Sequence, residues 1–217
     1  MIEDPYWAVL DDRFQWCTKA RQGWQFGESG IIAEFVRRAG LDIDHFAYEI
    51  GGGDGGELPL TCQLLSDPYW KVIVFEAAQE NREALAKKHP WLFDIRGKYE
   101  SSLQVENLRP GIVIIDVDSC DGWYMEELLE TSKPSLLVVE HYDLAGPYIA
   151  EFQDFDGRIP KWLCGMPLFN NFRIQWHADA LDVVAFRAGY LPFARTRCNS
   201  FYIDRTLIKK VCARVRF

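Results

Sequence analysis

The sequence predicts an α/β fold: an open, doubly wound and mostly parallel sheet with helices on both faces, forming a three-layer sandwich. Three observations support this. Apolar runs of strand length alternate with helical patterns along most of the chain. The run Gly111–Asp116 is β-branched, as is typical of a strand buried on both faces of a parallel sheet. Tyr190–Arg195 and Ser200–Asp204 follow each other without a helix between them, so they predict a closing antiparallel β-hairpin.

The other elements are read from periodicity and from the Gly and Pro residues that interrupt it. Strands are expected at His45–Ile50, Lys71–Phe75, Trp91–Ile95, Gly111–Asp116 and Ser135–Glu140. Helices are expected at Ile31–Arg38, Glu57–Leu65, Gln79–Lys88, around Glu126–Glu130, and at Trp176–Ala188.

Residues 142–171 are the one long stretch without clear periodicity. About 30 irregular residues after a central strand are uncommon inside a compact domain and are usually functional. Loops at the carboxyl ends of parallel strands surround the ligand crevice of such a sheet. We therefore predict a substrate lid at 142–171, with a packing insertion or an oligomer contact as the alternative.

Size and composition limit the classes of protein. The 217 residues fit one domain, 1–217, with 1–40 as an N-terminal helical segment. A net charge of −8 argues against a nucleic-acid partner, because neutralising phosphates requires clustered Lys and Arg. No apolar run approaches the ~20 residues of a membrane span, and the six scattered cysteines are typical of a reducing compartment. We expect a cytoplasmic protein without a membrane partner, and the oligomeric state stays open, a homo-oligomer included.

The most informative stretch is His45–Gly56, a short apolar strand that runs into a turn of glycines. Glycines at 51, 53 and 55 allow positive φ and a close approach of the backbone to a ligand. Glu76 follows the next strand, and one βαβ unit places an acid about 20 residues beyond such a turn beside a ribose. The stretch therefore predicts a site for an adenosine-containing cofactor. The plain alternative is that the glycines only make a tight strand-to-helix turn.

Two cofactors compete for this turn. Gly51-x-Gly53-x-x-Gly56 satisfies the dinucleotide fingerprint, in which a pyrophosphate lies on a helix N-terminus. Glu49-x-Gly51-x-Gly53-x-Gly55 instead resembles the first motif of class I S-adenosylmethionine-dependent methyltransferases. A carboxylate at Glu49 would repel a pyrophosphate, whereas it can receive the ammonium group of the cofactor's methionine part. The acid therefore favours S-adenosylmethionine.

Acidic residues and a histidine follow two neighbouring strands. Asp116 ends the first strand and is followed by Asp118 and Asp121, while Glu140 and His141 end the second. Adjacent strands lie ~4.8 Å apart, so these side chains should converge at one rim as candidate catalytic residues. Asp116, Asp118 and His141 could hold Mg²⁺ or Mn²⁺. Alternatively His141 is a general base, since the unperturbed pKa of histidine is about 6.5, or Asp116 and Asp118 only cap the next helix.

Four segments, in order along the chain, resemble one branch of a known family. They are Gln25–Ile32, Tyr48–Gly55, Ile114–Gly122, and the closing pair Ala188–Tyr190 with Asn199–Ile203. Together they are similar to the FkbM-type branch of S-adenosylmethionine-dependent methyltransferases. The sequence departs from the family pattern at Ser29, where an Asp is usual, and at Ser119–Cys120, where a glycine is common.

This resemblance implies a Rossmann-like class I methyltransferase fold and methyl transfer from S-adenosylmethionine. The acceptor would be a small molecule, commonly a hydroxyl of a sugar or natural product. The residues implied in cofactor binding are Glu49, Gly51, Gly53, Asp54, Gly55, Glu76 at the ribose, Ser101 near the adenine, and Asp116. Two other functions stay open: an NAD(P)-dependent oxidoreductase, and a cofactor-binding subunit without catalysis.

Overall fold

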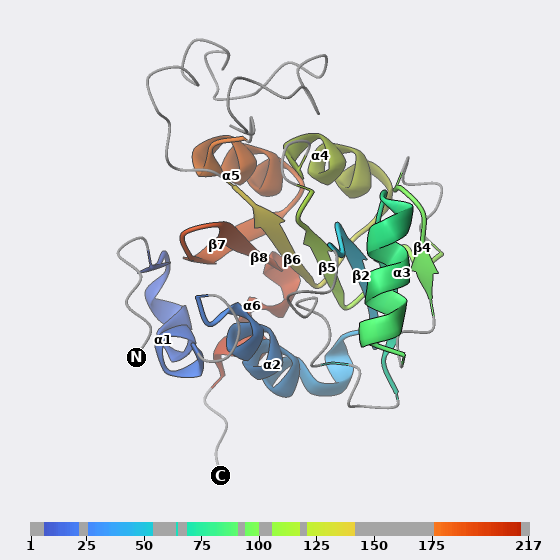
Figure 1. The fold of residues 1–217 in the computed structure, drawn as a ribbon. Coiled ribbons are helices and arrows are strands. Elements are labelled where there is room, and N and C mark those ends of the chain that lie inside the picture. Colours follow the sequence, from blue (N-terminus) through green and yellow to red (C-terminus); the bar gives the residue numbers. More distant parts are fainter. Residues whose placement is uncertain are drawn as a thin grey trace.

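An eight-stranded sheet runs through the centre of the computed structural model (Figure 1). The structure describes residues 7–21, 26–53, 64, 69–90, 94–99, 106–117, 121–141 and 176–213. Within these ranges the strand order is β1-β7-β8-β6-β5-β2-β3-β4. The sheet is open, because β1 and β4 form its two edges.

Five consecutive strands of this order, from β6 to the edge strand β4, are parallel, and the other three are antiparallel to their neighbours. Neighbours from β4 through β3, β2 and β5 to β6 pair in parallel, whereas β8 pairs antiparallel with β6, β7 with β8 and β1 with β7. The strands are β1 (Ala8–Val9), β2 (Phe46–Ile50), β3 (Lys71–Phe75), β4 (Ile95–Arg96), β5 (Ile112–Ile115), β6 (Leu136–Glu140), β7 (Tyr190–Arg195) and β8 (Asn199–Asp204). The predicted mostly parallel sheet with a closing hairpin is confirmed.

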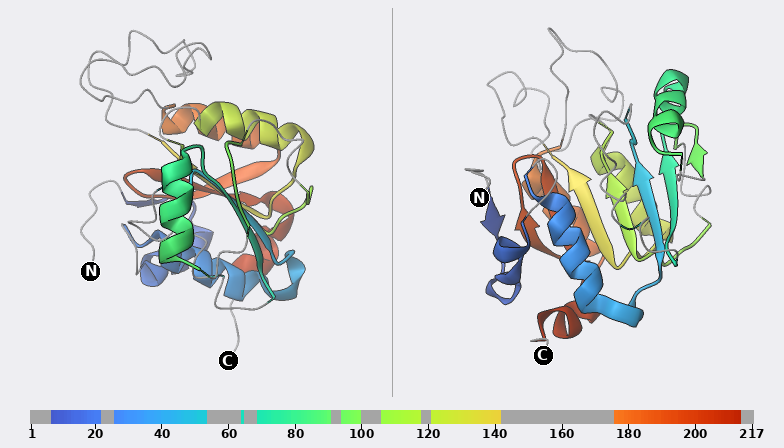
Figure 2. Two further views of the ribbon diagram at one scale, coloured as in Figure 1. Left: turned by 45° about the vertical axis from the view of Figure 1, so that its right-hand side comes forward. Right: turned by 60° about the horizontal axis from the view of Figure 1, so that its bottom comes forward.

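Helices cover both faces of the sheet, as Figure 2 shows most clearly for α4 and α5 on one side and α2 on the other. The helices are α1 (Trp16–Ala20), α2 (Glu28–Ala39), α3 (Gln79–Lys88), α4 (Asp121–Thr131), α5 (Ala178–Arg187) and α6 (Ile208–Cys212). Short 3-10 turns in the described residues include Asp12–Phe14, Gly40–Asp42 and Arg205–Leu207. No helix in the described part of the chain is both long and apolar enough to span a membrane.

Each face of the sheet has its own apolar core, because successive side chains of a strand point to opposite faces. In β2, Ala47 joins the cluster formed with α1, α2, α3 and α6. Tyr48 and Ile50 join the second cluster, formed with α4 and α5. The central strands are buried on both faces, and this explains their nearly continuous apolar runs.

Several predicted boundaries differ from the structure. Helix α2 begins at Glu28 rather than at residue 31, because Gly27 takes a φ of 91° and leaves an acid in the first turn, where the helix dipole favours it. Helix α4 begins at Asp121, earlier than expected. The third strand is described only at Ile95–Arg96. The predicted helix Glu57–Leu65, apart from Leu64, and the predicted lid at 142–171 lie outside the described residues.

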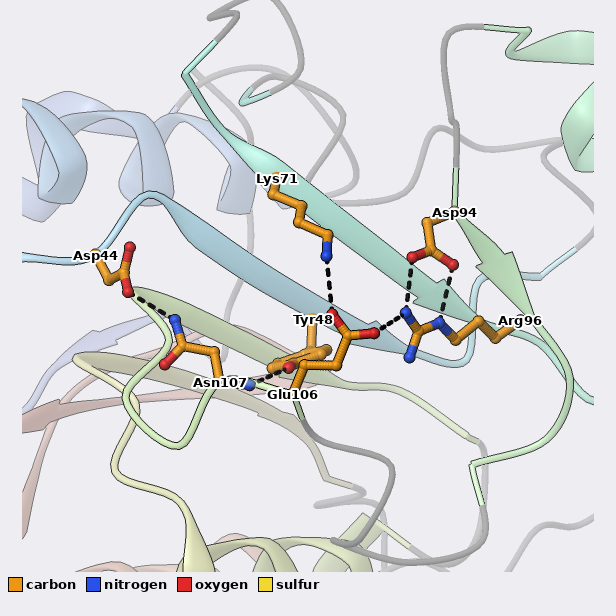
Figure 3. A network of polar contacts seen from close by, with 7 residues as sticks. All are labelled: Asp44, Tyr48, Lys71, Asp94, Arg96, Glu106 and Asn107. Atoms are coloured by element: carbon orange, nitrogen blue, oxygen red, sulfur yellow. Dashed lines mark hydrogen bonds and ion pairs between the residues drawn. The ribbon is translucent and has the colours of Figure 1, made fainter.

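A polar network crosses one face of β2, β3 and β4 (Figure 3). The Glu106 carboxylate accepts hydrogen bonds from Lys71 Nζ at 2.8 Å and Arg96 Nη2 at 2.5 Å. These two cations lower the pKa of Glu106 to about 2. The backbone N–H of Asn107 donates to the Tyr48 hydroxyl at 2.8 Å. The network thus connects Glu106 and Asn107, which lead into β5, with side chains of β2, β3 and β4.

A substitution at Gly122 tests the packing of α4 against Trp176, which lies two residues before α5. A Cβ built at Gly122 would lie 2.1 Å from the ring of Trp176, which is fully buried. We expect Gly122→Ala to destabilise the protein by about 1–3 kcal/mol through overpacking, despite the better helix propensity of alanine. Urea unfolding measures this. Gly97→Ala is the control, since a Cβ there meets nothing within 4 Å, and an equal loss in both variants would contradict the packing account.

Candidate functional site

The glycine turn lies at the carboxyl end of β2, between β3 and β5. Gly51 and Gly53 both have positive φ, 100° and 61°. The backbone N–H groups of Gly51 and Gly52 donate to the Phe75 carbonyl at 2.8 and 3.2 Å. The turn is therefore fixed to the end of β3.

The positions of this turn are glycine for different physical reasons. A Cβ at Gly51 would lie 1.7 Å from the carbonyl oxygen of Asp116, and one at Gly52 would lie 2.4 Å from a methyl group of Val74. These two positions are glycine because the turn packs tightly against β5 and β3. A Cβ at Gly53 would meet no atom of the described residues within 4 Å. Of the three described glycines of the turn, Gly53 is thus the one that packing against described neighbours does not explain.

Glu76 directly organises this turn. Its side chain is buried, and its Oε2 accepts a hydrogen bond from the Gly53 N–H at 2.8 Å. Its Oε1 accepts from the Ala78 N–H at 2.9 Å and from Asn81 Nδ2 at 3.4 Å. A carboxylate offers about four lone-pair sites, so capacity for ligand hydroxyls remains. The spacing of Glu76 in the sequence predicts a contact with a ribose, and this stays a prediction. The spacing did not reveal that Glu76 also holds the turn through the Gly53 N–H.

Glu49 is a buried acid within the sheet. It lies in β2 beside Val74 of β3 and Ile114 of β5, and its residue is 3% exposed. Strand alternation places it on the face of Ala47, toward α2 and α3. Burying a carboxylate is costly unless it has polar company, so the position is compatible with binding an ammonium group.

The structure brings Asp116, Glu140 and His141 to one edge of the sheet. Asp116 follows β5, and its N–H donates to the Ile50 carbonyl at 2.8 Å. Ile115 pairs with Val139, so Asp116 and Glu140 continue neighbouring parallel strands. His141 is fully buried, and its backbone N–H donates to the Cys198 carbonyl at 2.7 Å.

The Asp121 side chain holds the loop between β5 and α4. Its Oδ1 accepts a hydrogen bond from the Val117 N–H at 2.8 Å, and the side chain is fully buried. The acid thereby closes the loop that leads from β5 into α4. The alternative that Asp116 and Asp118 cap this helix stays a prediction, and Asp118 lies outside the described residues.

The described residues do not fit a metal site. Over the described ranges, no group of three or more His, Cys, Asp or Glu side chains is arranged to hold a metal ion. A hard divalent cation takes several oxygen ligands, and Asp116 with His141 supplies too few. Asp118, the third predicted ligand, lies outside the described residues.

Other predicted cofactor residues also lie outside the described ranges: Asp54, Gly55 and Ser101. Tyr99, next to the predicted adenine region, is described and lies in the core. Its ring packs edge-on against Phe75 and Tyr124, with centroids 5.3 and 5.4 Å apart. Burial raises the pKa of its hydroxyl.

Sequence reasoning missed three residues near this edge: Glu28, Thr196 and Asn199, all fully buried. Burial, followed by the negative charges of Glu140, Glu28 and Asp116, raises the pKa of the neighbouring Cys198 to about 12. Asn199 donates a hydrogen bond to Glu28 and pairs with Glu140, so the acid at the start of α2 lies close to the end of β6. Helical periodicity could not reveal this, because Glu28 and the hairpin are far apart in sequence.

No family model matches the sequence, and no curated protein matches it either. Solved structures resemble its fold. DesVI of Streptomyces venezuelae is 11% identical with a TM-score of 0.53, over 88% of this chain and 97% of that one. CurJ carbon methyltransferase is 11% identical with a TM-score of 0.51, over 81% of this chain and 52% of that one. An O-methyltransferase family protein from Burkholderia thailandensis is 13% identical with a TM-score of 0.48, over 80% and 55%.

The chain spans about half the length of the last two proteins. At such low identity the likeness shows the fold alone. It is the Rossmann-like fold of class I methyltransferases.

Proposed function

We propose that the protein is an S-adenosylmethionine-dependent methyltransferase that acts on a hydroxyl group of a small molecule, such as a sugar or a natural product. The observation that carries the proposal is the turn of Gly51 and Gly53, braced by the buried Glu76 carboxylate at the carboxyl edge of the sheet. Ligands of open α/β sheets bind at this edge.

The residues of the turn suit this cofactor chemically. Gly53 leaves open space beside the backbone. Glu76 presents carboxylate oxygens to ribose hydroxyls, and Glu49 offers a negative charge for the ammonium group of the methionine part. When bound, the cofactor supplies a methyl group on a sulfonium sulfur. Glu76 would suit the ribose of either cofactor, but a dinucleotide would bring a pyrophosphate toward the buried Glu49 carboxylate.

The neighbouring edge formed by Asp116, Glu140 and His141 is the proposed place of the acceptor. The acceptor hydroxyl has to lose its proton as its oxygen gains the methyl group, and the imidazole of His141 can take that proton. The burial of His141 keeps water from competing. Holding the hydroxyl in line with the methyl group supplies several kcal/mol of the barrier reduction.

Glu76→Ala is expected to weaken binding of S-adenosylhomocysteine by about 2 kcal/mol, or about 30-fold. The change removes the acceptor for ribose hydroxyls and leaves the Gly53 N–H without its partner. Isothermal titration calorimetry measures the dissociation constant. Glu106→Ala is the matched control, because it also removes a carboxylate that accepts several hydrogen bonds. Glu106 pairs with Lys71, which lies at the start of β3, whereas Glu76 follows the end of that strand. An unchanged affinity in Glu76→Ala would show that Glu76 takes no part in binding.

The same calorimetry separates this function from the alternatives. We expect S-adenosylhomocysteine to bind and NADH not to bind. The reverse would identify an NAD(P)-dependent oxidoreductase. Binding of S-adenosylhomocysteine without turnover of any acceptor would identify a cofactor-binding subunit without catalysis.

A further inference from the structure

A buried polar cluster joins the start of α2 to the turn between β7 and β8. The Oε1 atom of Glu28 accepts hydrogen bonds from the Thr196 hydroxyl at 2.6 Å and from Asn199 Nδ2 at 2.9 Å. All three residues are fully buried. One carboxyl oxygen at the start of α2 thus accepts hydrogen bonds from both ends of the turn, and Glu28 ties the turn to the helix.

The turn itself is closed by Thr196 and Asn199. The Thr196 N–H donates to the Asn199 carbonyl at 2.8 Å, and the Asn199 N–H donates to Thr196 Oγ1 at 3.1 Å. Within the described residues, Asn199 Oδ1 is buried without a hydrogen-bond partner. The carboxamide is therefore oriented through its Nδ2 by Glu28.

This turn is attached to the end of β6. The Cys198 carbonyl accepts the hydrogen bond of the His141 N–H at 2.7 Å, and Asn199 pairs with Glu140 in the sheet register. A shift of the turn would therefore move the backbone of His141.

We propose that Glu28 is a positioning residue, which fixes the β7–β8 turn and through it the backbone of Glu140 and His141. The proposal rests on the proposed function, because it takes this edge as the place where the acceptor binds. Glu28 acts through Thr196 and Asn199 and needs no contact with the acceptor itself.

Amide hydrogen exchange of the full chain tests this. We expect Glu28→Ala and Thr196→Val to raise exchange at the His141 and Asn199 amides about tenfold or more, because the turn opens locally. Exchange in β5 (Ile112–Ile115) should stay unchanged. The conservative variants Glu28→Gln and Thr196→Ser keep an acceptor oxygen and a hydroxyl, so they should restore most of the protection. Glu34→Ala, in the same helix but paired with Arg37 and Arg38 instead of with the turn, is the control.

Four results would overturn the proposal. Unchanged exchange at His141 in both Glu28→Ala and Thr196→Val would show that the turn does not depend on Glu28. A uniform rise that includes β5, or no recovery in the conservative variants, would show a general loss of stability. A weaker affinity of Glu28→Gln for S-adenosylhomocysteine would assign Glu28 to the cofactor site. If instead the wild type fails to bind S-adenosylhomocysteine, the proposed function fails while the exchange result still decides the role of Glu28 in the turn.

Discussion

Gly53→Val is expected to abolish measurable binding of S-adenosylhomocysteine, a loss of about 100-fold or more. Gly53 has a φ of 61°, in the left-handed region that β-branched residues strongly disfavour. Its N–H also donates to Glu76. The side chain would extend into the open space beside the turn, where the proposed cofactor lies. Titration calorimetry on protein with a native circular dichroism spectrum measures the effect.

Gly40→Val separates backbone strain from loss of the ligand site. Gly40 has a φ of 56°, and a Cβ there also meets nothing within 4 Å. It ends α2 just before the chain enters β2, at the opposite edge of the sheet from the turn. The control should lose stability comparable to that of Gly53→Val and keep its affinity. Near-normal affinity in a folded Gly53→Val protein would contradict the assignment of this turn.

His141→Ala is expected to lower methyl transfer by about 100-fold and leave the affinity for S-adenosylhomocysteine unchanged. The variant removes the group proposed to take the proton of the acceptor. The loss should shrink at high pH, where the acceptor ionises without help. The measurement is the initial rate of S-adenosylhomocysteine release as a function of pH, with an acceptor found by screening hydroxyl-bearing small molecules.

His89→Ala is the control for this loss, because His89 is also buried but lies at the end of α3. Normal turnover in His141→Ala would refute the role of His141 as the base. The metal alternative depends on Asp118, outside the described residues, and has its own test. It predicts that a chelator stops turnover by the wild type and that Mg²⁺ or Mn²⁺ restores it.

The sequence was a good guide wherever structure depends on local periodicity. Helix α3 has the bounds that its pattern predicts, and the apolar runs gave the five parallel strands in their order. The absence of a helical pattern between the last two strands was enough to predict the hairpin of β7 and β8. The spacing of the glycines and Glu76 correctly placed an acid beside the turn, where Glu76 accepts from the Gly53 N–H, while a cofactor at this turn stays a prediction.

Contacts between distant segments could not be predicted in this way. The two-residue strand β1 exists because it pairs with β7, far along the chain. The hydrogen bonds of Glu28 span 168 and 171 residues. The reason for glycine at position 51 is the carbonyl of Asp116 on a neighbouring strand, which no local pattern reveals. Single-sequence reasoning thus found the candidate residues but not the network that holds them.

A crystal structure with S-adenosylhomocysteine bound tests the central claim most directly. The account predicts the ligand at the carboxyl edge of β2 and β3, with its ribose hydroxyls bonded to the Glu76 carboxylate and its ammonium group near Glu49. The sulfur should face the edge formed by Asp116 and His141. A ligand bound elsewhere, or one without contact to Glu76 and the Gly53 turn, would contradict the account.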